Sequence, residues 1–139
     1  MNIVGNSIRS FSFHKDHYSI SVKDLSKSND FYGGTLGLRE IDNAGLGPKF
    51  RWYELDDKVQ IHLIEGEGNT ILLPKATHIA LNTSDFDGFS AFLETLNFPF
   101  ENWCGETRMS NMRPDGIRQI YLQDPDAYWI EVNDNDVQR

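Results

Sequence analysis

The sequence predicts an α+β fold in which two βαβββ modules form one pseudo-symmetric domain. The prediction depends on an internal repeat, because HYSISVKDLSKSNDFY begins at His17 and HIALNTSDFDGFSAFL begins at His78. Each copy has a histidine, an alternating strand pattern, an aspartate that can cap a helix, and an amphipathic helix. Neither half could bury its sheet face alone, so we expect the two halves to share a core.

The first half contains a strand, a helix and three further strands. Residues 17–22 alternate polar and apolar side chains with the period of a half-buried strand. Asp24 or Ser26 can cap the helix that follows, and Gly33-Gly34 is a stop signal for it. Strands are then expected at 35–41, 50–56 and 59–66, with a hairpin turn at 55–58 between the last two.

The second half repeats this order after a linker at 66–75. A strand at 77–83 precedes a helix that Asp85 can cap. The remaining elements are expected as a short strand at 98–102, a loop at 103–115, and closing strands at 116–124 and 128–134. We therefore expect an N-terminal segment at 1–14 and a single domain at 15–139, with module 1 at about 15–66 and module 2 at about 75–134.

Composition limits the class of partner. The 139 residues are 39% hydrophobic and carry a net charge of −8, which opposes binding to nucleic acid or to an anionic membrane. The single cysteine, Cys104, cannot form an internal disulfide, and no signal-peptide pattern or spanning apolar run is visible. We expect a cytoplasmic protein that binds a small-molecule substrate and neither nucleic acid nor membrane.

Several side chains of the metal-binding type fall on strand faces opposite an aliphatic set. They are His17, His62, His78 and Glu131. Taken singly, each histidine could be a strand residue that bonds to the backbone, but their joint placement on one type of face favours a shared site. Imidazole and carboxylate groups suit Zn, Ni, Fe, Co or Mn, and a catalytic ion needs three or four protein ligands with positions left open.

The segments HYSISVKDLSKSNDFYGGTLGLREI, VQIHLIEG, THIALNT and IYLQDPDAYWIEV resemble the vicinal oxygen chelate superfamily. This superfamily includes glyoxalase I, bleomycin and fosfomycin resistance proteins, methylmalonyl-CoA epimerase and extradiol dioxygenases. The likeness covers about residues 15–133. It implies a U-shaped mixed sheet of paired modules around a divalent metal ion, and a homodimer whose site lies within one chain or is shared between two.

The resemblance also implies a ligand set and a function. The first-strand ligand falls on His17, the fifth-strand ligand on His78 and the last on Glu131, while His62 falls where glyoxalase I has a glutamate. The leading interpretation is a metal-dependent lyase or isomerase like lactoylglutathione lyase. In it the metal is a Lewis acid, and Glu131 or His62 handles a proton.

Alternatives to this interpretation remain open. An Fe(II) extradiol dioxygenase would use His17, His78 and Glu131 as its metal triad, but the chain lacks the histidine that such enzymes carry upstream of the last strand. Fosfomycin-type thiol transferases share this triad, without a match here to their potassium-binding loop. A non-catalytic small-molecule binding protein, as in bleomycin resistance, fits the fold but leaves the histidines and Glu131 unexplained.

Other side chains are candidates for substrate contacts. Tyr121 could donate a hydrogen bond to a substrate oxygen, and Trp129 shares its strand face with Glu131. Arg113 could hold a substrate anion with its guanidinium fork, as could Arg108 and Arg118. The simpler reading of the arginines is solvated charge on an acidic protein, and strand alternation is expected to turn Arg118 away from the metal face.

Overall fold

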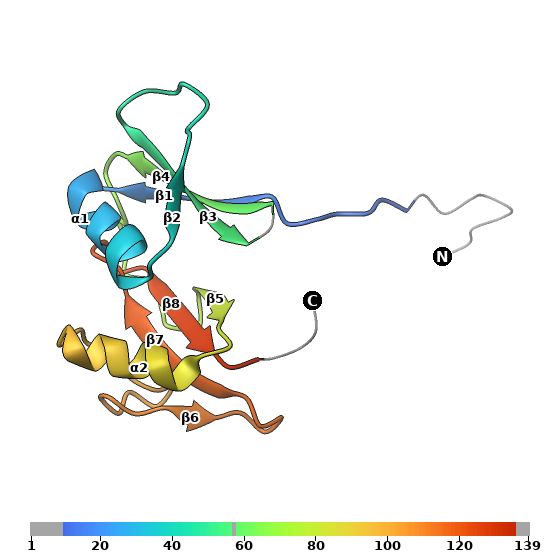
Figure 1. Cartoon of the computed structure of the whole chain (residues 1–139), viewed down its shortest axis with the longest axis vertical. Helices are drawn as coiled ribbons and strands as arrows, with labels where there is room; N and C mark the ends of the chain where they lie inside the picture. The colour runs from blue at the N-terminus through green and yellow to red at the C-terminus, as the bar shows by residue number, and fades with distance from the viewer. Residues whose placement is uncertain (1–9, 57, 136–139) are drawn as a thin grey trace, which may run out of the picture.

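The structure is a computed structural model that describes residues 10–56 and 58–135. Residues 1–9 of the expected N-terminal segment, Asp57 of the expected 55–58 turn and residues 136–139 of the expected domain lie outside the described residues. The α+β prediction is confirmed, with paired four-stranded mixed sheets and helices packed against them (Figure 1).

The first sheet has the strand order β1-β4-β3-β2. Its strands are β1 (His17–Val22), β2 (Arg39–Ile41), β3 (Phe50–Asp56) and β4 (Val59–Glu65). β1 runs parallel to β4, whereas the β4–β3 and β3–β2 pairs are antiparallel. The first strand of the module therefore lies at one edge of its sheet, beside the last.

The second sheet has the same topology, with the order β5-β8-β7-β6. Its strands are β5 (His78–Asn82), β6 (Asn111–Met112), β7 (Arg118–Gln123) and β8 (Trp129–Asn133). β5 runs parallel to β8, and β8–β7 and β7–β6 are antiparallel. The repeat seen in the sequence is thus a repeat of topology, and β5 occupies the edge position that β1 has in the first sheet.

The helix of module 1 begins as expected but ends later. Asp24 caps α1 (Leu25–Asn29) by accepting a hydrogen bond from the backbone N–H of Lys27 at 3.1 Å. The chain then continues as a π-helix, η1 (Asp30–Thr35), through the glycine pair that was expected to stop it. The Tyr53 ring lies 3.6 Å from the position of a Cβ on Gly33, so tertiary packing holds these turns in place. The strand expected from residue 35 consequently begins only at Arg39.

The helix of module 2, α2 (Phe86–Thr95), begins where the sequence predicts. Asp85 accepts a hydrogen bond from the backbone N–H of Gly88 at 3.0 Å. A Cβ at Gly88 would lie 2.1 Å from Oδ2 of Asp85, so a larger residue at this position would displace the capping carboxylate. The buried residues Phe86 and Leu93 anchor the helix to the sheet.

The segment between α2 and β7 differs from the prediction. The strand expected at 98–102 is reduced to single bridges, in which Glu101 pairs with Tyr121 and with Thr107. Pro99 cannot donate a ladder hydrogen bond, which limits the pairing of this segment. The expected loop at 103–115 contains the short strand β6, because Asn111 and Met112 pair with the start of β7.

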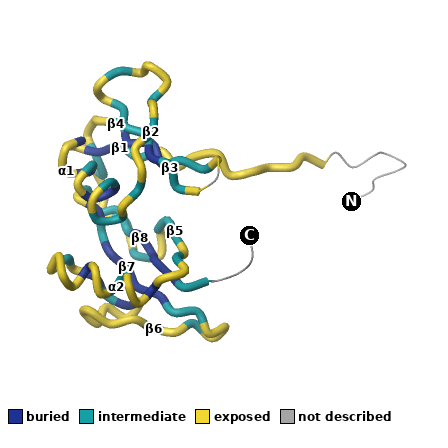
Figure 2. Tube along the Cα trace, in the orientation of Figure 1, coloured by how far each residue is buried: buried dark blue, intermediate teal, exposed yellow. Residues whose placement is uncertain are grey.

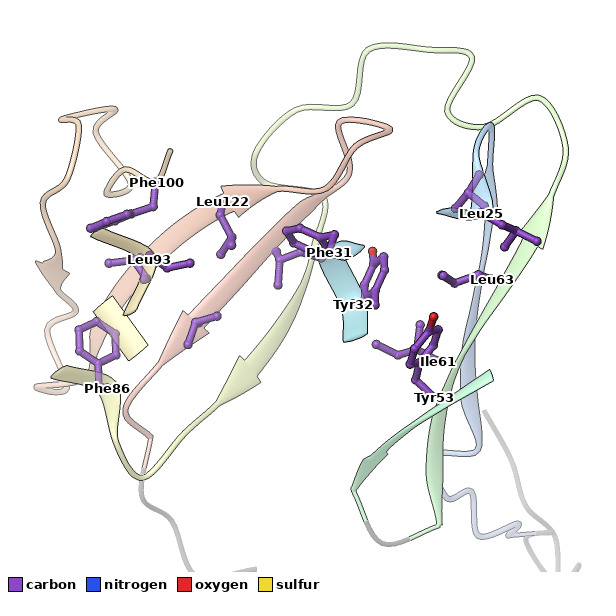
Figure 3. Packing of buried hydrophobic residues seen from close by; sticks show 14 residues of the cluster. Leu25, Phe31, Tyr32, Tyr53, Ile61, Leu63, Phe86, Leu93, Phe100 and Leu122 are labelled. Carbon is purple, nitrogen blue, oxygen red and sulfur yellow. The ribbon is translucent and has the colours of Figure 1, made fainter. Parts of the chain in front are cut away.

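Buried residues occur in both modules (Figure 2). The buried apolar side chains form one cluster that both modules supply (Figure 3). Figure 3 shows Phe31 and Tyr32 between the side chains of the two sheets. The Phe31 and Phe98 rings lie 5.5 Å apart, and the Tyr32 hydroxyl donates to the Asp124 carboxylate at 2.8 Å across the modules. As expected from the repeat, neither sheet buries its apolar face alone.

A membrane-spanning element is not found in the part of the chain that the structure describes. None of its helices combines the length and the apolar composition needed to cross a bilayer.

Candidate metal centre

Module 1 presents its two candidate ligands as part of a stack of aromatic rings. The register of β1, β4 and β3 places His17, His62 and Trp52 on one face of the sheet. The ring centroids of His17 and His62 are 4.1 Å apart with an interplanar angle of 16°, and those of His62 and Trp52 are 3.8 Å apart at 3°. We call these three side chains the ring stack.

Each histidine of the ring stack has one nitrogen engaged in a hydrogen bond. Nδ1 of His17 donates to Asp16 Oδ2 at 2.5 Å, and Nε2 of His62 donates to Gln60 Oε1 at 2.7 Å. Burial lowers the pKa of His62, and the neighbouring His17 lowers it further, so the His62 ring is neutral at pH 7. The exposed fraction is 8% for His62 and 39% for the His17 side chain.

Module 2 brings His78 and Glu131 together. Nε2 of His78 lies 3.1 Å from Oε1 of Glu131, and Nδ1 of His78 lies 2.7 Å from the carbonyl oxygen of Lys75. Because a carbonyl only accepts hydrogen bonds, Nδ1 carries a proton and Nε2 faces the carboxylate. This is the arrangement by which metal-binding histidines are held in protein sites.

The Glu131 carboxylate is buried and fully bonded. The Tyr121 hydroxyl donates to Oε1 at 2.9 Å, and the Asn133 amide donates to Oε2 at 2.6 Å. Burial acts to raise the pKa of Glu131, but the hydrogen bonds from Asn133, Tyr121 and Gln119 outweigh it and the pKa is lowered. Glu131 is therefore ionised at neutral pH, although its exposed fraction is only 4%. Burial of Tyr121 and the hydrogen bond from its hydroxyl to Glu131 raise the pKa of Tyr121 well above its usual range, so the hydroxyl stays protonated.

Lys75 is a residue of this site that the sequence reasoning missed. Its ammonium group donates to Glu101 Oε2 at 2.5 Å and to the carbonyl of Asn102 at 2.8 Å. It also lies 5.5 Å from the Tyr121 ring centroid and 5.0 Å from that of Trp129. Lys75 thus joins the linker to the 101–103 segment beside Glu131. A lysine in a predicted linker resembles solvated charge, and no pattern in the sequence distinguishes it.

The arginines are held by carboxylates or amides. Arg113, just after β6, donates to Asp115 through Nε at 3.0 Å and Nη2 at 2.5 Å. Arg108 donates to Asn97. Arg118 lies on the α2 side of the sheet, 4.7 Å from the Phe86 ring centroid, and so faces away from Glu131 as strand alternation predicts.

The candidate ligands therefore form two pairs, His17 with His62 and His78 with Glu131. Among the described residues, no three His, Cys, Asp or Glu side chains gather closely enough to hold a metal ion. A cavity of about 330 Å³ lies between the modules, but it is lined by residues such as Lys15, Tyr18 and Leu81 and by none of these four. Each sheet thus holds one of the two pairs.

Comparison with known proteins assigns the chain to a family. The family model described as Glyoxalase/Bleomycin resistance protein/Dioxygenase superfamily matches residues 14–132, so the chain belongs to this superfamily. Over 122 residues it is 30% identical to "Uncharacterized protein YwbC" of Bacillus subtilis (strain 168), an alignment that covers 84% of this chain and 93% of that protein.

Two further relatives are more distant. "Lactoylglutathione lyase" of Pseudomonas putida is 25% identical over 151 residues, which cover 84% of this chain and 82% of that protein. A solved structure of a glyoxalase family protein from Bacillus anthracis superposes with a TM-score of 0.69 at 21% identity, and covers 93% of this chain and 100% of that one. At this identity the structural likeness shows the fold alone, and it agrees with the paired-module topology.

Proposed function

We propose that the protein is a metal-dependent lyase or isomerase of the glyoxalase type, resembling lactoylglutathione lyase. Its substrate would be a small molecule that chelates the metal through neighbouring oxygens. Superfamily membership supports the class, since members commonly bind divalent metal ions and small molecules. We place this activity in the cytoplasm, where an exposed thiol such as that of Cys104 stays reduced.

The contact between His78 and Glu131 is the observation that carries the proposal. The Lys75 carbonyl accepts a hydrogen bond from Nδ1 of His78, so Nε2 is the nitrogen that faces Oε1 of Glu131 at 3.1 Å. Two acceptors at this distance repel each other unless a proton or a cation lies between them. An imidazole and an ionised carboxylate together suit a divalent ion such as Zn, Ni, Fe, Co or Mn.

We propose further that two chains complete each site as a homodimer. The strands that begin each module, β1 and β5, are edge strands of their sheets. β1 carries His17 and lies beside β4, which carries His62. β5 carries His78 and lies beside β8, which carries Glu131. An edge strand leaves a row of backbone groups for pairing with another chain. Such pairing would bring His17 and His62 of one copy toward His78 and Glu131 of the other.

The side chains of the site fit a proton-transfer reaction. A divalent ion bound there would act as a Lewis acid that polarises a substrate carbonyl. Glu131, ionised and buried, would accept the proton from the neighbouring carbon at Oε2 and return it one atom further along. Tyr121 and Asn133 would hold this carboxylate in place, and neutral His62 offers a second acceptor at Nδ1. Trp129 and Arg113 are the proposed substrate contacts.

Metal content tests the proposal. Protein purified without a metal-affinity tag is analysed for bound elements beside the double variant His78→Ala/Glu131→Ala. The matched control is His14→Ala, since His14 is exposed and outside both pairs. We expect about one Ni, Zn, Co or Mn ion per site in the wild type and the control, and none in the double variant. Turnover of a 2-oxoaldehyde–thiol adduct would then identify the lyase.

Other outcomes separate the alternatives. Stoichiometric iron with oxygen uptake on catechols would favour the dioxygenase. No retained metal, with a ligand bound unchanged at fixed stoichiometry, would favour a binding protein and overturn the proposal. The dimer is tested by mixing His17→Ala with the double variant, because a shared site predicts that the mixture binds the metal more tightly than either variant alone.

A further inference from the structure

The ring stack extends across three neighbouring strands. Trp52 lies on β3, His62 on β4 and His17 on β1, and successive rings are nearly parallel. His62 is the middle ring, so both of its faces are covered. The half-buried Trp52 closes one end of the stack, and His17 at the other end is the most exposed of the three.

Parallel stacking is a poor geometry for two ligands of one ion. The lone pairs of imidazole nitrogens lie in the ring planes, and a ligand nitrogen sits about 2.1 Å from the metal with its lone pair aimed at it. Rings that are 4.1 Å apart and within 16° of parallel direct their lone pairs side by side, so they do not converge on a common point.

The two histidines each keep one nitrogen free of these hydrogen bonds, but the bonded nitrogens have different partners, a carboxylate for His17 and a neutral amide for His62. Nε2 of His62 is already a donor to Gln60 Oε1 at 2.7 Å. In His17 the bonded nitrogen is Nδ1, whose partner is the Asp16 carboxylate, and this leaves Nε2 for a metal. A carboxylate that binds the far nitrogen is a common support of metal-ligating histidines. His78 has the corresponding arrangement with the Lys75 carbonyl.

We infer that His62 is a positioning residue rather than a metal ligand. His62 and Trp52 hold the His17 ring by stacking. Of the four candidate ligands this leaves His17, His78 and Glu131, the triad that the resemblance to the superfamily already implies. The inference rests on the proposed function, because it names the ligands of the same site. It assigns a role to Trp52. It also replaces the expected ligand set of His17, His62, His78 and Glu131, in which His62 took the place of a glutamate of glyoxalase I.

Paired substitutions at position 62 separate stacking from ligation. His62→Phe keeps a ring of similar shape that has no nitrogen, whereas His62→Ala removes the ring. We expect the Co²⁺ dissociation constant of His62→Phe to stay within about threefold of the wild type, and that of His62→Ala to rise about tenfold or more, as is typical for supports of metal ligands. At position 52, Trp52→Phe should behave like the wild type and Trp52→Leu like His62→Ala.

X-ray absorption of the Co²⁺ protein counts the imidazoles directly. We expect two per ion in both the wild type and His62→Phe. Three per ion in the wild type, or a loss of affinity above about 100-fold in His62→Phe with its thermal unfolding unchanged, would overturn the inference while the metal-dependent function stands.

Absence of metal binding by the wild type would instead defeat the proposed function, and the stack is then tested without metal. The carbon-bound ring protons of His17 should carry a ring-current shift from the His62 ring stacked on it. This shift should persist in His62→Phe and Trp52→Phe and move toward the unfolded value in His62→Ala and Trp52→Leu. Unchanged shifts in all four variants would overturn the stacking role.

Discussion

The two modules share one topology but hold their ligand-type side chains by different forces. In module 1 each histidine makes one side-chain hydrogen bond, and the further contacts are ring faces, with His62 between Trp52 and His17. In module 2 they are directional hydrogen bonds that converge on the buried carboxylate of Glu131. The repeated backbone therefore fixes where the candidate ligands stand, while neighbouring side chains decide how firmly and in which direction each one points.

The two modules therefore differ in how far their side chains must rearrange to bind a cation. The Glu131 carboxylate has a donor on each oxygen and His78 has a fixed tautomer, so the module 2 half-site needs little rearrangement to bind a cation. The ring stack of module 1 depends on dispersion between ring faces, which allows rotation at a smaller cost. We expect module 2 to supply most of the metal affinity.

Among these substitutions, Glu131→Gln should give the largest effect, a loss of metal affinity. The amide keeps the shape of the side chain but removes the charge that faces His78, so we expect the metal dissociation constant to rise by more than about 100-fold. The measurement is a Co²⁺ titration followed by absorption, with His17→Gln as the module 1 counterpart. Equal losses in the two variants would contradict the asymmetry between the half-sites.

The β7–β8 turn gives module 2 a pH dependence. Burial raises the pKa of Asp124 from 3.8 to about 6, despite hydrogen bonds from the Tyr128 backbone and the Tyr32 hydroxyl. Because the pKa of Asp124 is raised in the folded state, the protonated carboxyl stabilises the folded protein relative to the ionised one. The contribution of Asp124 to the unfolding free energy is therefore complete below pH 4 and is lost as the pH rises through 6. A shift of this size corresponds to about 3 kcal/mol of unfolding free energy.

Asp124→Asn should therefore remove this contribution. The unfolding free energy of the wild type should fall relative to that of the variant between pH 4 and 6, by up to about 3 kcal/mol. Urea unfolding at several pH values measures the difference, and Asp126→Asn in the same turn is the control. Parallel curves for the wild type and Asp124→Asn would show that the burial of Asp124 has no energetic consequence.

Lys75→Met should lower the unfolding free energy by about 2 kcal/mol, because Glu101 and the 102–103 carbonyls lose a partly buried cation. The exposed Lys49 of module 1 offers the control Lys49→Met, for which we expect a change within about 0.5 kcal/mol. Chemical denaturation measures both. A Lys75→Met protein as stable as the control would mean that the linker does not depend on this cluster.

Substituting glycine into the β-hairpin turns should give the smallest change in the unfolding free energy, and the change should be equal in the two modules. Lys58 in the β3–β4 turn has φ 67° and Ala127 in the β7–β8 turn has φ 66°, a region that favours glycine. We expect Lys58→Gly and Ala127→Gly each to raise the unfolding free energy by about 0.5–1 kcal/mol. Thermal unfolding provides the measurement, and destabilisation at only one turn would break the pseudo-symmetry at this point.

Much of the fold followed from local pattern. Alternation located β1 and β3 to the residue, and the aspartates at 24 and 85 cap their helices as expected. These features depend on neighbours within about four residues, which is the range over which sequence patterns report. The glycine pair at 33–34 was misread, because the Tyr53 ring that packs there comes from a strand about twenty residues away.

The sequence by itself determined that His17, His62, His78 and Glu131 stand on the strands of a repeated unit, since alternation and repeat spacing are properties of the chain. Only the tertiary structure decided that they form two pairs, that His62 lies between two rings, and that Lys75 reaches the Glu101 carboxylate. Those contacts depend on strand register and on the order of strands in each sheet. The pairing of β1 with β4 and of β5 with β8 joins residues about fifty positions apart, and no local pattern encodes which side chains then meet.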